Sequence, residues 1–140
     1  MKKYLLVATA FFTINSYAEE GYVGHFRGNQ NLEIRGCGDS RSINRSIDHW
    51  EITITKDAEN SFVGQLDRRY GLITYKATID EDGKVKGKMS GMDTSARRWT
   101  GFFTATIDGD ELKINVSGIL TPGACRFQGK IDATRQQKTE

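Results

Sequence analysis

The sequence is poor in the residue types that build most metal and catalytic sites. It has two cysteines, two histidines and one proline in 140 residues. The histidines, His25 and His49, and the cysteines, Cys37 and Cys125, lack any spacing that a zinc site would need. No nucleophile elbow is present, and the acidic stretches DEDG and DGDE do not continue into an EF-hand loop. We therefore expect a protein that is not an enzyme and has no metal or cofactor.

One long apolar run, Tyr4 to Ile14, begins the chain, and it is shorter than the roughly 20 residues that cross a bilayer. It follows a basic start and precedes small residues that end at Ala18. This is the layout of a secretory signal peptide cleaved near Ala18-Glu19. We expect residues 1–18 to be removed and residues 19–140 to form one domain, periplasmic or secreted, with no transmembrane segment.

The predicted mature chain carries no excess of either charge. The formal net charge of +2 comes from Lys2 and Lys3, and removing them leaves 18 basic and 18 acidic residues. Overall basicity therefore gives no reason to expect nucleic acid as a partner. The distribution of the charges along the chain is more informative than their sum.

The two cysteines lie far apart in the sequence. In an exported protein such a pair is best interpreted as one structural disulfide, here Cys37–Cys125. Closing a loop of that length stabilises a fold by roughly 4 kcal/mol on the chain-entropy model.

Alternation of apolar and polar residues runs through most of the chain, and helical periodicity is hard to find. Trp50, Ile52 and Ile54, for example, alternate with polar neighbours. Tight acidic turns separate such segments, which indicates antiparallel strands around one core. The strands expected are 22–27, 31–36, 48–55, 62–66, 73–79, 85–89, 99–107, 112–116 and 125–133.

An antiparallel meander of eight or nine strands closes most simply into a small up-and-down β-barrel, with a two-sheet β-sandwich as the alternative. Glycines at core-facing positions favour the barrel, because they suit sharply bent strands. These glycines are Gly64, Gly87, Gly101 and Gly129.

In outline, the pattern of alternating strands and tight turns resembles the calycin type of meander barrel. The resemblance implies the barrel architecture alone, since no lipocalin or avidin motif is present. Large side chains are expected to fill the interior, and the alternative is a carrier that encloses one small apolar ligand. The inward side chains expected are Trp50, Phe62, Tyr75, Met89, Trp99, Phe103 and Phe127.

Two similar phrases, YKATIDEDGKVKGKMSG and FTATIDGDELKINVSG, each follow an Arg-Arg-aromatic element. Either a shared hairpin pattern or a duplication explains the likeness. In a meander both elements reach the same end of the barrel. The segment Cys37 to Ile47 is expected to be a loop at that end, and the opposite end carries the acidic turns. Eight of the ten arginines lie at or near the first end, which we call the rim.

We predict that this rim binds an anionic partner, because the arginine fork matches carboxylates and phosphates and stacks on aromatic faces. The partner would be an anionic small molecule, a glycan, a lipid headgroup or an acidic protein surface; the last would make the protein an inhibitor or immunity-type factor. The alternative is a solvated rim that pairs with Asp39, Asp48, Asp67 and Asp93. We expect a monomer. The ligand-binding residues predicted are Arg41, Arg45, Arg68, Arg69, Tyr70, Arg97, Arg98, Trp99 and Arg126.

Overall fold

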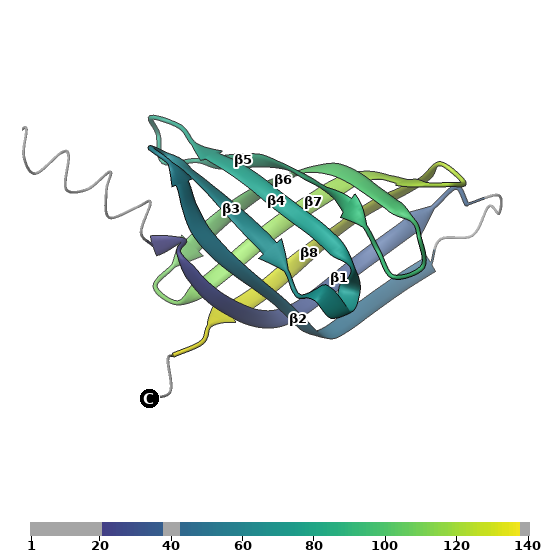
Figure 1. Cartoon of the computed structure of the whole chain (residues 1–140), viewed down its shortest axis with the longest axis horizontal. Helices are drawn as coiled ribbons and strands as arrows, with labels where there is room; N and C mark the ends of the chain where they lie inside the picture. Colours follow the sequence, from purple (N-terminus) through teal and green to yellow (C-terminus); the bar gives the residue numbers. More distant parts are fainter. Residues whose placement is uncertain (1–20, 38–42, 138–140) are drawn as a thin grey trace, which may run out of the picture.

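The computed structural model describes residues 21–37 and 43–137, and in it the chain is an eight-stranded closed antiparallel barrel (Figure 1). Each strand pairs with the next one along the chain, and β8 pairs with β1. The predicted all-β meander barrel is confirmed, and the sandwich alternative is wrong. The strands are β1 (Gly24–Arg35), β2 (Ile43–Ala58), β3 (Ser61–Leu66), β4 (Leu72–Ile79), β5 (Val85–Met92), β6 (Arg98–Asp108), β7 (Glu111–Thr121) and β8 (Cys125–Arg135).

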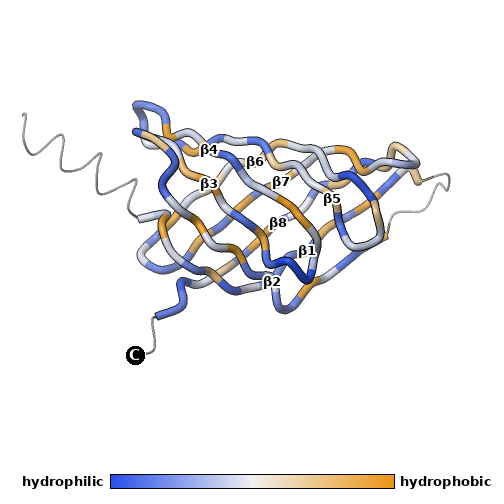
Figure 2. Tube along the Cα trace, in the orientation of Figure 1, coloured by the Kyte–Doolittle hydropathy of each residue, from blue (hydrophilic) through white to orange (hydrophobic). Residues whose placement is uncertain are grey.

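Side-chain alternation explains the barrel. Along β6, for example, exposed and buried residues alternate from Arg98 to Ala105, and hydrophilic and hydrophobic positions alternate along the strands in Figure 2. Burial of one face per strand supplies the main driving force for closure. Within the described residues, no helix has the length and apolarity needed to cross a membrane. The predicted signal peptide lies outside the described residues.

The first two strands are longer than the alternation predicted. The expected weak strands 22–27 and 31–36 form the single strand β1, and β2 begins at Ile43 instead of in the region of Asp48. Gly28 pairs with Trp50 whereas Gln30 pairs with Ile47, so β2 carries one extra residue at a bulge. A bulge breaks the period-2 pattern, which explains why part of the segment Cys37 to Ile47 was wrongly expected to be a loop.

The disulfide lies where the barrel closes. Cys37 follows β1 and Cys125 begins β8, and their Cα atoms are 4.6 Å apart in a formed bond. The predicted Cys37–Cys125 disulfide is confirmed. The space around the four core-facing glycines is crowded: at each position, an added Cβ would come within 2.6 Å of a neighbouring atom.

Candidate functional site: a cavity at an opening in the barrel wall

The barrel wall is incomplete beside β2. This strand pairs with β3 only from Ile52 to Ala58, because β3 is short and is followed by the 3-10 helix η1 (Arg68–Tyr70). Among the described residues, the first half of β2, Ile43–Trp50, has β1 as its only partner strand. The wall is therefore open between this half of β2 and the loop that joins β5 to β6.

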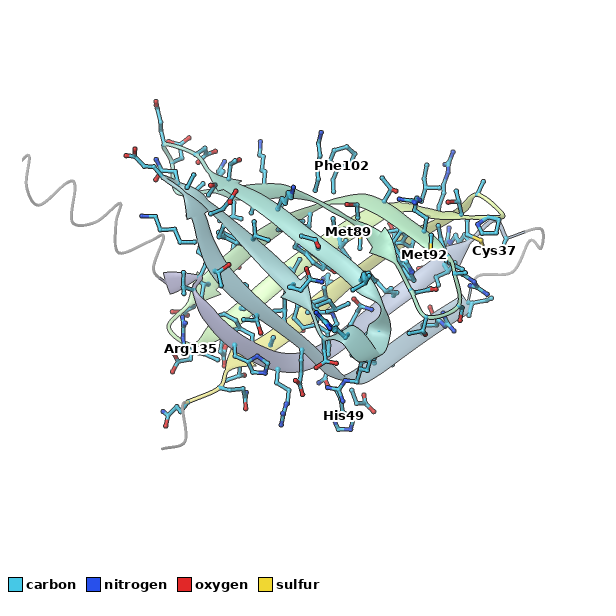
Figure 3. The ribbon with its side chains drawn as sticks, viewed as in Figure 1. Cys37, His49, Met89, Met92, Phe102 and Arg135 are labelled. Atoms are coloured by element: carbon cyan, nitrogen blue, oxygen red, sulfur yellow. A yellow bond between two sulfur atoms is a disulfide. The ribbon has the colours of Figure 1, made fainter. Side chains whose placement is uncertain are left out.

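A cavity of about 330 Å³ lies behind this opening. Inward side chains such as Met89 form its deeper walls, and Figure 3 shows Met89 within the barrel outline. The interior is thus hollow at this end, although a filled core had been expected. The lining residues are Gln30, Leu32, Arg45, Ser46, Ile47, Leu66, Tyr70, Ile73, Tyr75, Met89, Asp93, Thr94, Ser95, Trp99, Val116 and Phe127.

Helix η1 places Tyr70 at the cavity. The Asp67 carboxylate accepts a hydrogen bond from the Arg69 backbone N–H at 3.0 Å, which caps the helix. The Tyr70 hydroxyl donates to the His49 carbonyl at 2.7 Å, and the Arg69 guanidinium donates to the same oxygen at 3.0 Å. These bonds fasten η1 to the bulged part of β2, so the aromatic ring is held in the cavity wall. His49 contributes its backbone carbonyl to this contact.

Arg69 also belongs to an ion-pair cluster on the outer face. Glu51 Oε1 lies 2.8 Å from Arg27 Nε and 2.8 Å from Arg69 Nη2, and Oε2 lies 3.3 Å from His25 Nε2. Burial works to raise the pKa of Glu51, but the two guanidiniums prevail and hold it below its ordinary value. Arg69 is therefore engaged in fixing η1 to β2.

Asp93 organises the other side of the opening. Its carboxylate accepts backbone N–H bonds from Ser95 at 2.8 Å and Arg97 at 3.0 Å, and a bond from Trp99 Nε1 at 2.9 Å. The Trp99 ring packs edge-on against Phe127 with centroids 4.8 Å apart. Burial works to raise the pKa of Asp93, but these hydrogen bonds, with the Trp99 bond foremost, hold it below its ordinary value. Asp93 thus fixes both the β5–β6 loop and a cavity-wall ring.

The lowered pKa of Asp93 predicts a loss of stability in acid. A carboxyl whose pKa is lower in the folded chain contributes stability above its unfolded pKa, near 4, and loses it as the pH falls through the folded pKa. We expect Asp93→Asn to cost about 1 kcal/mol at neutral pH and to show a shallower decline in acid than the wild type. Urea denaturation of both proteins between neutral pH and about pH 3 would test this, and parallel declines would contradict it.

Two neutral polar side chains at the cavity have no partner within the described part of the chain. Gln30 is 8% exposed, and neither its amide nor the Tyr75 hydroxyl makes a hydrogen bond to any described residue. Burial raises the pKa of Tyr75, so the hydroxyl stays neutral. Arg45 is exposed at the mouth and forms no ion pair with residues 21–37 or 43–137. The cavity thus combines apolar walls and neutral polar groups with the Arg45 guanidinium and the Asp93 carboxylate, and the carboxylate is already hydrogen-bonded to Ser95, Arg97 and Trp99.

The predicted ligand-binding residues are only partly brought together. Arg45, Tyr70 and Trp99 line the cavity. Arg41 lies outside the described residues. The other predicted arginines, Arg68, Arg69, Arg97, Arg98 and Arg126, are exposed and do not line it.

Sequence reasoning missed Gln30 as a cavity residue. It shares a period-2 pattern with the buried Leu32 and Ile34, so a polar residue at an inward position was the available signal. No group of three or more His, Cys, Asp or Glu that could hold a metal occurs among the described residues.

Comparisons with known proteins support the fold alone. No protein-family model matches the sequence, and no curated protein matches it. Transferrin-binding protein B from Haemophilus parasuis is similar in structure, with a TM-score of 0.55 and 15% identity over 84% of this chain. A candidate outer membrane protein from Bacteroides fragilis gives a TM-score of 0.55 and 16% identity over 85% of this chain. The chain spans 27% and 52% of the lengths of those proteins.

Proposed function

We propose that the protein is an exported, non-enzymatic binding protein that takes a small amphipathic anion into the cavity beside β2. The cavity itself carries the proposal, because it joins an apolar interior to three of the predicted ligand-binding residues. The apolar part of the ligand would lie between Met89, Trp99 and the other inward side chains, and its acidic group would meet Arg45.

The polar groups suit such a ligand. A guanidinium offers charge-assisted hydrogen bonds to a carboxylate, sulfonate or phosphate. The Gln30 amide and the Tyr75 hydroxyl, both without partners in the described chain, would be satisfied by polar atoms of a ligand. The volume of about 330 Å³ is near the small end of ligand sites, which favours a short chain or a single ring system over a complete lipid.

The disulfide supports export. Bonds of this kind persist in the periplasm and outside the cell, whereas the cytosol keeps thiols reduced. The Cys37–Cys125 bond and the signal-like start of the sequence therefore agree on an oxidising compartment. Envelope or medium metabolites with an acidic head and an apolar body are the class of ligand to test.

Arg45→Gln is expected to weaken binding of an amphipathic anion about tenfold, the loss for one charge-assisted hydrogen bond worth about 1.5 kcal/mol. The probe is 1-anilinonaphthalene-8-sulfonate, whose fluorescence rises in apolar sites, titrated into the folded protein. Arg126→Gln is the matched control, because Arg126 is exposed on β8 and does not line the cavity. Its affinity should equal that of the wild type.

Competition experiments distinguish the contribution of the ligand's acidic group to binding from that of its apolar body. Octanoate should displace the probe at a lower concentration than octanol, which has the same chain without the charge. Met89→Trp should reduce the affinity for both competitors by filling the cavity. Equal competition by the acid and the alcohol, or equal effects of the two arginine variants, would overturn the assignment of Arg45. Undiminished binding to Met89→Trp would place the ligand elsewhere.

A protein partner is the second candidate, and exposed apolar side chains favour it. Leu72 is 66% exposed and Met92 is 41% exposed. The two residues are paired across β4 and β5, and Met92 also pairs with Arg98 on β6. Transferrin-binding protein B, by its name, binds a protein. An acidic protein with an apolar contact patch would fit here. Pull-down from envelope extract with wild type and Leu72→Asp would distinguish this candidate, since only a protein partner would be lost with Leu72.

A further inference from the structure

A second concave feature lies on the outer face of the barrel, and its lining shares Leu32, Arg45, Ser46 and Val116 with that of the cavity. It is an open groove of about 980 Å³ that crosses the strands from β5 through β6, β7, β8 and β1 to β2. We call it the outer groove. With strands spaced by about 4.8 Å, a path over six of them is about 24 Å long. Such a length suits a chain molecule better than a small metabolite.

Strand register explains how the groove forms. Its floor is one row of paired residues at inward positions, Gly87–Phe103–Val116–Gly129–Leu32, and Leu32 pairs in turn with Arg45. The two glycines of this row carry no side chain. Two rows of outward side chains flank the floor. The first is Lys88–Phe102–Ser117–Gln128–Glu33–Asn44, and the second is Lys86–Thr104–Asn115–Lys130–Asn31–Ser46.

Neighbouring side chains inside the barrel leave no room for a Cβ at the two glycines of the floor. A Cβ on Gly87 would lie 2.5 Å from the Phe103 ring, and one on Gly129 would lie 2.4 Å from Leu32 Cδ2. Large neighbouring side chains therefore occupy the space that these residues leave free. Glycine at such positions allows a strand to bend sharply, which fits the concave outer face.

The walls of the outer groove combine one aromatic ring with many neutral polar groups. Phe102 is 65% exposed, and in Figure 3 its side chain projects away from the barrel. Exposing the apolar surface of a phenyl ring to water is unfavourable in free energy. The neutral groups of the walls are amides and hydroxyls, on Asn31, Asn44, Ser46, Thr104, Asn115, Ser117 and Gln128.

The charges of the outer groove favour an anion. Arg45, Lys86 and Lys130 line it, and Lys88 Nζ lies 5.9 Å from the centre of the Phe102 ring. Of the two acidic lining residues, Glu33 is already paired with Arg35, which leaves Asp132. Cations thus outnumber the available carboxylates along the groove.

From these features we infer that the outer groove binds an acidic polysaccharide. The apolar face of a sugar ring packs on an exposed aromatic ring, amides and hydroxyls match sugar hydroxyls, and the lysines attract the acidic groups. An extended peptide is a poor fit, because the strands that cross the groove from β5 to β1 are paired on both sides and offer no free backbone edge.

The test uses alginate as a carboxylated probe, heparin as a sulfated probe and dextran as an uncharged one, with binding measured by calorimetry. At least one acidic probe should bind, and dextran should not. Phe102→Ala, and separately Lys86→Gln with Lys130→Gln, should each weaken that binding at least tenfold. Lys113→Gln is the control, because Lys113 is an exposed strand lysine that does not line the groove.

The polysaccharide-binding measurements either support or overturn the assignment of the outer groove. Loss of binding in the groove variants with an unchanged control supports it, and the preferred acidic probe identifies the acid group. Equal weakening by Lys113→Gln would indicate non-specific charge attraction and overturn it, as would binding of neither acidic probe. Tighter binding of a single-stranded oligonucleotide, weakened by Phe102→Ala, would overturn it in favour of a nucleic-acid groove. Arg45 lines both features, so Arg45→Gln alone does not separate the two proposals. Met89→Trp changes the cavity and Phe102→Ala changes the groove, so with these two variants the proposals can fail separately.

Discussion

Replacing Cys37 and Cys125 with alanine is expected to lower the free energy of unfolding by about 4 kcal/mol. The bond closes a loop with a sequence separation of 88, so its loss gives the unfolded chain many more conformations. Alanine is chosen because Cys125 is 4% exposed, and a serine there would bury a hydroxyl. Urea denaturation of the oxidised wild type and the double variant measures the difference.

Reduced wild type is the control for this change, since it loses the bond but keeps both sulfur atoms. It should match the double alanine variant to within about 1 kcal/mol, the size of a small packing difference. If the oxidised and reduced proteins unfolded at the same urea concentration, the bond would contribute nothing to stability and the entropic argument would be wrong.

Gly28→Ala is expected to lower the free energy of unfolding by about 3 kcal/mol, at the upper end of overpacking effects. A Cβ at this position would lie 1.9 Å from the Asp132 carbonyl oxygen and 2.5 Å from Ala133 Cα. Both atoms belong to the backbone of β8, so no side chain can rotate to make room. The β1–β8 pair would have to separate locally, and urea denaturation would record the loss.

Gly21→Ala provides the matched glycine control. Its added Cβ would meet only Ile107 Cγ2, at 3.8 Å, which is an ordinary contact distance. We expect its stability to stay within about 0.5 kcal/mol of the wild type, as for surface substitutions. Equal losses in the two variants would show that the loss of glycine as such, and not the close approach of β8, determines the effect.

The barrel could be predicted because its strands carry an uninterrupted period-2 pattern. From Arg98 to Ala105 every second side chain is buried, and the tight turns leave few other topologies. The disulfide was predicted from two distant cysteines in a chain expected to be exported, and the meander agreed with it because it brings Cys37 and Cys125 to the same end. The same logic failed at the start of β2, where the bulge between Ile47 and Trp50 shifts the pattern by one residue.

The cavity could not be predicted for a different reason. Its position depends on β2 extending back to Ile43 while β3 ends at Leu66, which leaves half of β2 without a second partner strand in the described structure. The end of β3 was predicted, but the start of β2 was not, because the bulge in β2 breaks its period-2 pattern. Whether the inward side chains fill the barrel interior depends on their volumes and rotamers, and the hydropathy pattern does not report either. Of the predicted arginines that lie in the described residues, only Arg45 lines the cavity.

The pairing of β1 with β8 also bears on how fast the barrel forms. Seven of the eight strand pairs join neighbours along the chain and can assemble as hairpins, whereas β1–β8 joins the two ends of the domain. Contacts between residues that are distant in sequence slow folding, because the chain loses loop entropy before the contact forms and contributes stabilising energy. The Cys37–Cys125 bond spans this slowest contact. In the oxidised unfolded chain the disulfide already holds the end of β1 close to the start of β8. We therefore expect the oxidised protein to refold faster than the alanine variant.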